Sequence, residues 1–377
     1  MEHVGLNLLY LVPGEVGGTE ILARRLIDAL ARARPDVRFT VFCGIEAAPS
    51  LAGEGWPENV VIHRMDVACR NKPRRILAEL FQLPREARRA GVDLLHSLGT
   101  TSPLRTPCPS VVSVHDLIYL HYPETFPPAA RLGLKLLVGP GARRADRVLA
   151  LSEAAKRDLV EHLRLDPDRV HPVHIGGMRR SDEFTPEAEL RGRLGLGEGP
   201  VVLCVSAALR HKNLPRLIDA FAEISGSRPD ARLVLVGHHG LDGDALRAQV
   251  VDRDLDGRVI QTGWIADADL EGLYRLAACC AYPSLLEGFG IPVLEAMARG
   301  LPVACADATS LPEVAGDAAL LFDPLDTHAI AAAIERLLSD EALREQLRER
   351  GLERAAGFTW EKCAEGVLAV YELALSA

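Results

Sequence analysis

Apolar residues follow two patterns along this chain: short continuous runs, and longer stretches in which they recur at helical spacing. Short apolar runs bounded by polar or turn residues predict buried strands. In the first half of the chain such runs lie at 7–12, 38–43, 60–63, 93–97, 110–114 and 148–151. Helical spacing predicts helices over 20–33, 72–90, 131–147 and 153–163. This alternation of strand and helix is typical of a doubly wound α/β domain with a parallel sheet.

The alternation is interrupted over residues 170–184 and then begins again. Glycines and clustered charges break the pattern in this segment, which we interpret as a linker between two domains. Beyond it, strands are predicted over 201–206, 232–237, 258–262, 280–282 and 302–306, and helices over 213–225, 243–255, 268–278, 292–299 and 327–339. Two successive arrays of this kind predict two Rossmann-like domains that face each other across a cleft.

The composition is ordinary for a globular enzyme, with 377 residues, 48% of them hydrophobic and 25% charged. The net charge of −9 is distributed unevenly. Residues 1–175 carry 23 Lys and Arg against 20 Asp and Glu, whereas the remainder carries 20 against 32. The N-terminal half is therefore the one suited to an anionic surface, but it is not basic enough to predict a nucleic-acid partner.

The eight cysteines include no C-x-x-C pair, so we expect no zinc site built from them. The first apolar run is too short for a signal peptide, and no run of 18 or more apolar residues could cross a membrane. We therefore expect a protein of the reducing cytoplasm.

The stretch from Ser284 to Met297 carries the strongest candidate chemistry. Its two glutamates, Glu287 and Glu295, are eight positions apart, and two glycines and a proline lie between them. Because Pro is favoured in the first turn of a helix, a loop over 287–291 is expected to lead into the helix over 292–299. A helix N-terminus attracts phosphate, and carboxylates on either side would suit the hydroxyls at the two ends of a nucleotide diphosphate sugar. A glycine-rich loop with only a structural role is the alternative.

Further candidates lie where predicted strands end. Arg210 and Lys212 follow the strand at 201–206, where two cations are well placed for phosphate oxygens. His115 and Asp116 follow the strand at 110–114, at the edge of an open sheet where ligands bind. Each pattern also fits a structural turn or cap. Three D-x-D pairs, within 252–256 and 267–269, are interpreted as solvated helix caps rather than as a metal site.

Basic and apolar residues alternate in two of the predicted helices, 72–90 and 131–147, and Pro84 is expected to kink or split the first. Basic amphipathic helices can lie on anionic lipid. The same pattern is also typical of a helix that packs on a core and exposes a solvated face. The sequence leaves both interpretations open.

Long stretches of this sequence resemble the family-four group of retaining GT-B glycosyltransferases. The resemblance is carried by SAALRHKNLPRLIDAF, LVLVG, TGWIADADLEGLYRLA and YPSLLEGFGIPVLEAMARGLPVACADATSLPEVAGDAALLFDPLD, and in the first half by VDLLHS, SVHDLIYLHYPETFP and LALSEAAKRDL. It implies a GT-B fold with an acceptor-binding domain over 1–175 and a nucleotide-sugar-binding domain over 176–355. It also implies a final helix, within 356–377, that packs back on the N-terminal domain.

The resemblance implies roles for individual residues. Glu295 would hold the ribose hydroxyls and Glu287 the hydroxyls of the donor hexose. Arg210 and Lys212 would hold the diphosphate, and His115 would lie near the reacting carbon on the acceptor side. The other donor-binding residues that it implies are Gly17, Gly18, Gly237, Trp264, Ile265, Gly288, Phe289, Gly290 and Ile291.

The implied reaction transfers a hexose, with retention at the anomeric carbon, to a glycan or lipid-linked glycan in surface polysaccharide synthesis. No nucleophile for a covalent intermediate can be assigned, which favours a front-face path. GDP-mannose is the first donor expected, then UDP- and dTDP-hexoses, and neither a metal nor a cofactor is expected to be required. Peripheral contact with the inner face of the membrane is an open possibility. A nucleotide-sugar 2-epimerase and a non-catalytic sugar-nucleotide-binding scaffold are the alternative functions.

Overall fold

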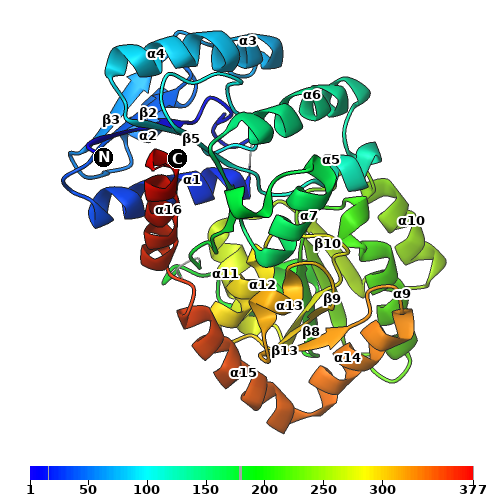
Figure 1. Cartoon of the computed structure of the whole chain (residues 1–377). Helices are drawn as coiled ribbons and strands as arrows, with labels where there is room; N and C mark the ends of the chain where they lie inside the picture. The colour runs from blue at the N-terminus through cyan, green and yellow to red at the C-terminus, as the bar shows by residue number, and fades with distance from the viewer. Residues whose placement is uncertain (16, 178–180, 377) are drawn as a thin grey trace. The chain divides into compact units, whose positions relative to one another are not determined.

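The computed structural model describes residues 1–15, 17–177 and 181–376, and its chain divides into two compact units. The N-terminal unit comprises Met1–His121, Phe126–Gly176 and Phe358–Ala377, and the C-terminal unit comprises Tyr122–Thr125 and Gly177–Gly357. Each unit is built on one parallel sheet with helices packed around it (Figure 1). The predicted α/β class, with two Rossmann-like parallel sheets, is confirmed.

The described residues of the N-terminal unit form a seven-stranded parallel sheet in the order β3-β2-β1-β4-β5-β6-β7. Its strands are β1 (His3–Asn7), β2 (Arg38–Cys43), β3 (Val60–Arg64), β4 (Leu94–Ser97), β5 (Ser110–Ser113), β6 (Arg147–Ala150) and β7 (Val170–Pro172). Its α-helices are α1 (Gly18–Ala33), α2 (Ala48–Ala52), α3 (Lys72–Leu77), α4 (Leu83–Ala90), α5 (Ile118–His121), α6 (Pro128–Arg144), α7 (Glu153–Leu163) and α16 (Trp360–Leu375). The strand order reverses between β1 and β4, so the crevice of this sheet lies at their carboxyl ends.

The described residues of the C-terminal unit form a six-stranded parallel sheet in the order β10-β9-β8-β11-β12-β13. Its strands are β8 (Val201–Val205), β9 (Arg232–Val236), β10 (Val259–Gly263), β11 (Cys279–Tyr282), β12 (Val303–Ala306) and β13 (Ala319–Phe322). Its α-helices are α8 (Glu187–Leu194), α9 (Leu214–Ser225), α10 (Gly243–Asp252), α11 (Asp267–Leu276), α12 (Ile291–Ala298), α13 (Leu311–Ala315), α14 (Thr327–Ser339) and α15 (Glu341–Ala356). Here the order reverses between β8 and β11.

The last helix of the chain, α16, belongs to the core of the N-terminal unit and lies beside α1 (Figure 1). Its Val367 and Tyr371 are buried together with Leu6 of β1. The Tyr371 hydroxyl is 2.7 Å from Nδ1 of the buried His96 at the end of β4. The apolar face of α16 therefore completes a core that the first 175 residues leave open.

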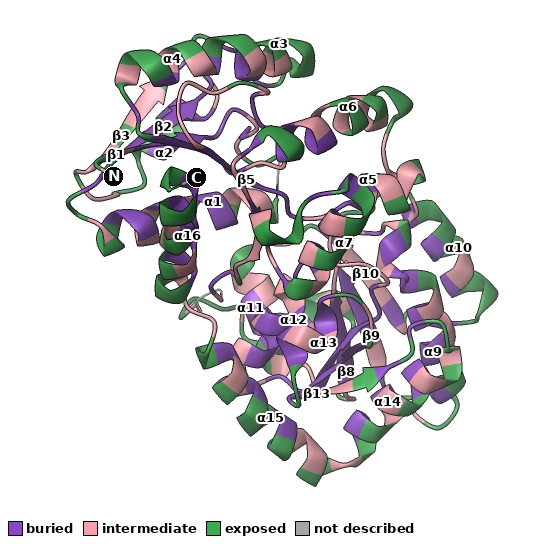
Figure 2. Cartoon of the chain, viewed as in Figure 1, coloured by how far each residue is buried: buried purple, intermediate pink, exposed green. Residues whose placement is uncertain are grey.

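Burial explains why the apolar runs form strands. The central strands of both sheets are buried, whereas the outward faces of the surrounding helices are exposed (Figure 2). A strand that is covered by helices on both faces carries continuous apolar residues rather than alternating ones. In the described part of the chain, no helix is both long and apolar enough to span a bilayer.

Two predictions at element level need correction, and several elements were not predicted. The strand expected at 7–12 lies earlier in the chain, as β1 (His3–Asn7). It ends at Asn7 because the side-chain oxygen of this residue accepts a hydrogen bond from the Leu9 main-chain nitrogen and turns the chain. The expected linker contains a strand, β7 (Val170–Pro172), and its residues 178–180 lie outside the described part of the chain. Six short or weakly patterned elements were not predicted: α2, α5, α8, α13, α15 and β13.

The basic helix predicted over 72–90 is split, as Pro84 led us to expect. A π-helical segment, Ala78–Gln82, separates α3 from α4, and Pro84 lies in the first turn of α4. Pro cannot donate to a preceding carbonyl, so the helix changes its hydrogen-bond pattern just before it. The second basic helix is α6 (Pro128–Arg144).

Candidate active site

The candidate residues of the C-terminal unit follow the carboxyl ends of its strands. Lys212 comes after β8, and Glu287 comes after β11. These two strands are neighbours at the point where the strand order reverses. In open parallel sheets this is the place where ligands bind. The fold therefore brings residues 75 positions apart in sequence into the crevice of the sheet.

Lys212, Glu287 and Tyr282 form a close polar cluster there. The Lys212 ammonium donates to Oε1 of Glu287 at 2.6 Å, and the Tyr282 hydroxyl donates to the same oxygen at 2.8 Å. Lys212 Nζ also lies 3.2 Å from the Tyr282 hydroxyl. The side chains of Lys212 and Glu287 are only 16% and 11% exposed. The cluster is thus a shielded ion pair with a tyrosine hydroxyl as its third member.

Electrostatics keep Glu287 ionised. Burial by itself would raise the pKa of its carboxyl, but the Lys212 charge and hydrogen bonds from Lys212, Ser284 and Tyr282 outweigh burial and lower the pKa. Burial, followed by the Glu287 charge, raises the pKa of Tyr282, so its hydroxyl keeps its proton. The cluster therefore presents a carboxylate that can accept further hydrogen bonds, beside an ammonium group that can donate them.

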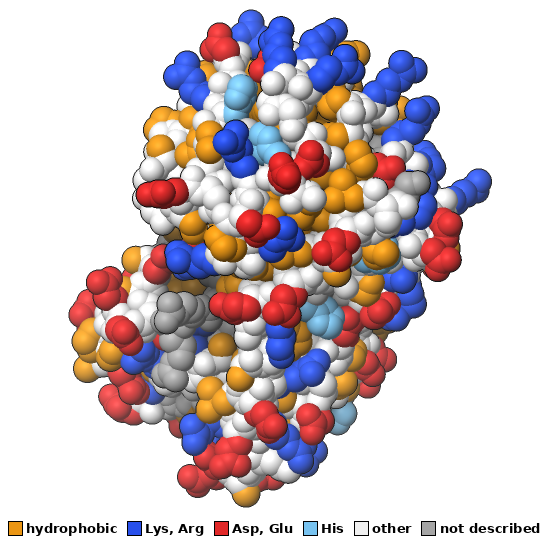
Figure 3. Space-filling view, turned by 60° about the vertical axis from the view of Figure 1, so that its left-hand side comes forward, with side chains coloured by type: hydrophobic (Ala, Val, Ile, Leu, Met, Phe, Trp, Pro, Cys, Tyr) orange, Lys and Arg blue, Asp and Glu red, His pale blue; other side chains and the backbone are white. Residues whose placement is uncertain are grey.

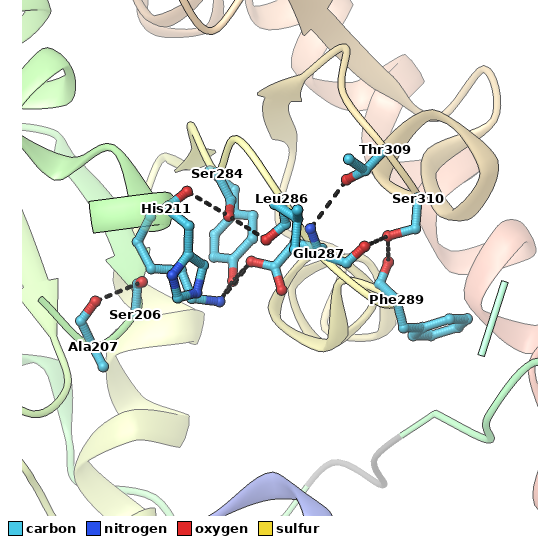
Figure 4. Close-up of polar contacts among 11 residues, drawn as sticks. Ser206, Ala207, His211, Ser284, Leu286, Glu287, Phe289, Thr309 and Ser310 are labelled. Atoms are coloured by element: carbon cyan, nitrogen blue, oxygen red, sulfur yellow. Dashed lines mark hydrogen bonds and ion pairs between the residues drawn. The ribbon is translucent and has the colours of Figure 1, made fainter. Parts of the chain in front are cut away.

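Hydrogen bonds to the segments after β8 and β12 hold the loop that carries Glu287 in place (Figure 4). The Glu287 main-chain nitrogen donates to Oγ1 of Thr309 at 3.0 Å. The buried Ser310 hydroxyl is within bonding distance of the carbonyl oxygens of Glu287, at 3.0 Å, and Phe289, at 2.7 Å. Ser284 in turn lies 3.2 Å from the His211 carbonyl oxygen. These contacts join the segments after β8, β11 and β12 into one rigid rim.

The loop ends at the N-terminus of α12, which begins at Ile291, one residue earlier than predicted. Gly290 precedes it with φ 110°, a backbone conformation that favours glycine, and a Cβ at this position would also lie 2.6 Å from the Leu311 side chain. Among the described side chains none caps this helix. Pro292 in its first turn has no N–H, and the Val293 and Leu294 nitrogens already donate to the Gly290 carbonyl oxygen. What this end of the helix offers a phosphate is therefore mainly the positive end of the helix dipole.

Glu295 lies in the middle of α12 and has a different environment. Among the described residues, the donor to its carboxylate is the Tyr274 hydroxyl, at 3.1 Å. Burial raises the pKa of Glu295, and the nearby Arg299 opposes this only in part. The guanidinium of Arg299 contacts the Glu271 carboxylate at 2.8 Å. Glu295 therefore keeps acceptor capacity for ligand hydroxyls.

Arg210 and Lys212 occupy the same short 3₁₀ turn but differ in environment. The Arg210 side chain is 68% exposed, and its Nε lies 3.6 Å from Asp242. Only Lys212 reaches Glu287. Both cations therefore face a carboxylate, but Lys212 is shielded and tightly paired, whereas Arg210 is exposed and loosely paired, so the two are not equivalent.

Trp264 and Ile265 follow β10, on the opposite side of β9 from Lys212. The Trp264 indole is 73% exposed, and its ring centre lies 5.8 Å from that of His238. Gly237, which directly follows the neighbouring strand β9, has φ 144°, and a Cβ there would lie 2.4 Å from the Ser206 carbonyl oxygen. Glycine at 237 thus lets the segments that follow β8 and β9 approach each other closely. The exposed Trp264 ring lies on the other side of β9 from Lys212.

The remaining candidates belong to the N-terminal unit. Gly17 precedes α1, and Gly18 is its first residue. His115 follows β5 and is only 6% exposed. Burial lowers the pKa of its imidazole to about 4, although a hydrogen bond with the Leu98 main chain acts in the opposite direction. Within the described part of the chain its Nε2 has no hydrogen-bond partner, so the neutral ring has one nitrogen available.

Sequence reasoning missed several members of the site. Tyr282, Thr309 and Ser310 were not singled out, although Tyr282 directly precedes the Ser284–Met297 stretch and ends a predicted strand. The interpretation of all the D-x-D carboxylates as solvated caps is wrong for Asp269. It lies in the first turn of α11, where Thr185 donates to it at 2.5 Å and Arg193 lies 2.6 Å away. Asp269 thus joins α11 to α8.

Comparison with known proteins agrees with this geometry. The model for glycosyl transferases group 1 matches residues 187–354, and that for glycosyltransferase family 4 matches residues 16–176. O-antigen chain mannosyltransferase B of Escherichia coli is 30% identical over 270 residues, which cover 70% of each chain. The chain belongs to the group 1 glycosyltransferases.

Solved structures share the fold at low sequence identity. Sucrose-phosphate synthase from Thermosynechococcus elongatus aligns with a TM-score of 0.75 at 23% identity, over 99% of this chain and 98% of that one. Anabaena HepE in complex with UDP and glucose aligns with a TM-score of 0.74 at 21% identity, over 99% of this chain and 100% of that one. These likenesses support the GT-B fold.

Proposed function

We propose that this chain is a retaining hexosyltransferase that takes its sugar from a nucleotide diphosphate donor. The observation that carries the proposal is the Lys212–Glu287–Tyr282 cluster at the switch point between β8 and β11, beside the uncapped N-terminus of α12. A diphosphate at this N-terminus would place hydroxyls of the attached hexose within reach of the Glu287 carboxylate. The Trp264 ring, two strands away from β8, would stack on the base, and Glu295 would accept from the ribose hydroxyls.

In the proposed reaction, the bond between the anomeric carbon and the diphosphate oxygen breaks while an acceptor oxygen attacks the same face. The acceptor proton passes to the leaving phosphate, so no protein nucleophile and no metal is needed. Negative charge grows on the phosphate, and Arg210, Lys212 and the N-terminus of α12 offset it. Fixed donors of this kind, aimed at charge that develops in the transition state, are usually the largest catalytic term.

We propose that His115 contributes on the acceptor side. Its buried ring is neutral above a pKa of about 4, and its Nε2 is available. A neutral imidazole can exchange hydrogen bonds with sugar hydroxyls without adding charge. Gly17 and Gly18, at the start of α1, are proposed to let the N-terminal loop approach the phosphates.

For the donor we propose GDP-mannose first, with UDP- and dTDP-hexoses as the next candidates. The first choice draws support from the name of the Escherichia coli mannosyltransferase, and the second from the UDP bound to Anabaena HepE. The proposed acceptor is a glycan or lipid-linked glycan of a bacterial surface polysaccharide at the inner face of the membrane.

The test has two stages. A thermal-shift panel of GDP, UDP and dTDP identifies the base, because a ligand that binds only the folded chain raises the melting temperature. The matching nucleotide sugars are then mixed with candidate acceptors in the presence of a strong chelator, and nucleotide release and the product's anomeric configuration are measured. Release with a retained configuration supports the proposal. Conversion of donor sugar without an acceptor would indicate an epimerase, and binding without release would indicate a scaffold.

We further propose that the N-terminal unit attaches to anionic lipid. Leu77, at the end of α3, and Phe81, in the π-helical segment that follows, are 55% and 57% exposed. Leu132 and Leu136 of α6 are 58% and 62% exposed. Lys and Arg side chains gather on the end of this unit that α3 and α4 form (Figure 3). Exposed apolar side chains at helical spacing within a basic surface are typical of interfacial helices.

Co-sedimentation with vesicles tests the attachment. We expect binding to vesicles that contain anionic lipid, weak binding to neutral vesicles, and a clear loss in Phe81→Glu. Val251→Glu is the matched control, because Val251 is also 57% exposed but lies on α10 of the C-terminal unit. Equal binding by Phe81→Glu and Val251→Glu would refute this attachment surface.

A further inference from the structure

A cluster of two histidines and a carboxylate lies on the N-terminal unit, apart from the residues discussed above. Asp158 and His162 are four positions apart on α7, and His121 is the last residue of α5. Nε2 of His121 lies 2.8 Å from Oδ1 of Asp158, and Nδ1 of His162 lies 3.1 Å from the same oxygen. The two imidazole rings meet edge to face with their centres 4.7 Å apart.

We propose that His121, Asp158 and His162 form a binding site for a divalent transition metal ion, Zn²⁺ above all. One ligand atom from each side chain lies within 4.8 Å of the other two. Two imidazole nitrogens and one carboxylate oxygen make a ligand set that suits zinc, whereas calcium and magnesium require more oxygen ligands. Water would fill the remaining coordination position.

Metal binding requires the three side chains to adjust their spacing. With zinc–ligand bonds of about 2.0–2.1 Å, tetrahedral ligand atoms lie about 3.3–3.4 Å apart. The Asp158 oxygen must therefore move away from the His121 nitrogen by about 0.5 Å and from the His162 nitrogen by about 0.3 Å. The two ring nitrogens, which lie within 4.8 Å of each other, must come to the same spacing of about 3.3–3.4 Å. The three side chains are 27%, 25% and 37% exposed, so they can rotate without disturbing the core. His162 Nδ1 would exchange its 3.2 Å contact with the Asp158 carbonyl oxygen for the metal.

A metal at this site would link α5 to α7 at the point where the chain passes from one unit to the other. His121 is where the chain leaves the N-terminal unit, since Tyr122–Thr125 belong to the C-terminal unit. His115 precedes it by six residues in the same segment. A metal held between α5 and α7 would therefore stabilise the end of the segment that carries His115, as a structural ion and not as a participant in sugar transfer.

The hydrogen bonds within the cluster are the competing explanation, and metal titration separates the two. Isothermal titration of chelator-stripped full-length chain with Zn²⁺ should give one site per chain that His121→Asn and His162→Asn each weaken. Substitutions around metal ligands already weaken binding by about 10–100-fold, so loss of a ligand is expected to cost at least about 100-fold. His63→Asn is the matched control: His63 also faces a carboxylate, that of Glu86, at 3.3 Å.

Three further readouts keep the test decisive. Circular dichroism of each variant establishes that it is folded before its titration is interpreted. Zn²⁺ should raise the melting temperature of the wild type and of His63→Asn but not of His121→Asn, and Mg²⁺ should raise none of them. Co²⁺ bound to the wild type should lack the intense sulfur-to-cobalt absorption that cysteine ligands give. Absence of a stoichiometric site in the wild type, or an unchanged site in both histidine variants, would overturn the proposal.

Discussion

Replacement of Glu287 by glutamine tests the central contact of the candidate site. Glutamine is nearly isosteric and can still accept from the Tyr282 hydroxyl, but it removes the negative charge that faces Lys212 at 2.6 Å. The variant therefore separates the charge of the cluster from its shape.

The contact geometry sets the expected loss of stability. A hydrogen bond to a charged group is worth about 1.5–3 kcal/mol, and breaking a fully buried ion pair costs about 3–5 kcal/mol. Lys212 and Glu287 keep 16% and 11% exposure, and the glutamine oxygen can still accept from the ammonium group. We therefore expect the free energy of unfolding of the C-terminal unit to fall by about 1.5–3 kcal/mol at pH 7.

The loss should depend on pH in a defined direction. The folded pKa of Glu287 lies below its ordinary value of 4.5. A group with a lowered folded pKa contributes stability above its unfolded pKa and loses that contribution as the pH falls through the folded one. The difference between wild type and Glu287→Gln should therefore be full at pH 7 and shrink steadily below pH 4.5.

Denaturant unfolding at a series of pH values measures this difference, with Glu335→Gln as control. Glu335 pairs with Arg228 at 2.9 Å, but both side chains are about a third exposed, so its loss should cost less than about 1 kcal/mol. In the same preparations, turnover of Glu287→Gln should fall by about 10²–10³-fold if the carboxylate acts on the transition state. A loss of stability no larger than that of Glu335→Gln, or one that persists unchanged at acidic pH, would refute the reasoning.

Three other predictions follow from single residues. Trp264→Ala should weaken binding of the preferred nucleoside diphosphate by about 1–3 kcal/mol in calorimetric titration, the range for stacking of one base on an aromatic ring; unchanged affinity would remove Trp264 from the base site. His115→Gln should lower turnover with little change in nucleotide affinity, and because the pKa of His115 is about 4, the wild-type rate profile should show no inflection from this residue between pH 5 and 8. Ser152→Ala should lower the free energy of unfolding by about 0.5–2 kcal/mol, since its side chain accepts from the Ala155 nitrogen and caps α7; an unchanged denaturation midpoint would contradict that role.

Much of the fold could be predicted because its signals are local. Continuous apolar runs marked β2 at Arg38–Cys43 with the correct bounds, and helical spacing together with the Ser152 cap marked α7 at Glu153–Leu163. Errors occurred where local signals were weak or misleading. The apolar residues after Asn7 are buried in a loop, and β13 is only four residues long and buries only Phe322 fully. Burial in a loop and burial in a strand give the same apolar pattern, so sequence reasoning could not separate them.

The sequence by itself determined the chemical types at the candidate site. The glycines and the proline that place Glu287 just before a helix are local features, as are the cations that follow β8. The partners of these groups were decided only by the tertiary structure. Lys212 meets Glu287 because β8 and β11 are adjacent in the sheet, and strand order is not encoded in any short segment.

The same reason explains the two features that sequence reasoning did not reach. The Asp158 and His162 pair is visible at helical spacing, but its third member, His121, comes from another helix. Arg210 and Lys212 looked equivalent in sequence, yet the fold leaves Arg210 exposed and loosely paired with Asp242 and shields Lys212 in a tight pair with Glu287. Residue types and local periodicity belong to the sequence, whereas which charges are shielded, paired or exposed depends on contacts between distant segments.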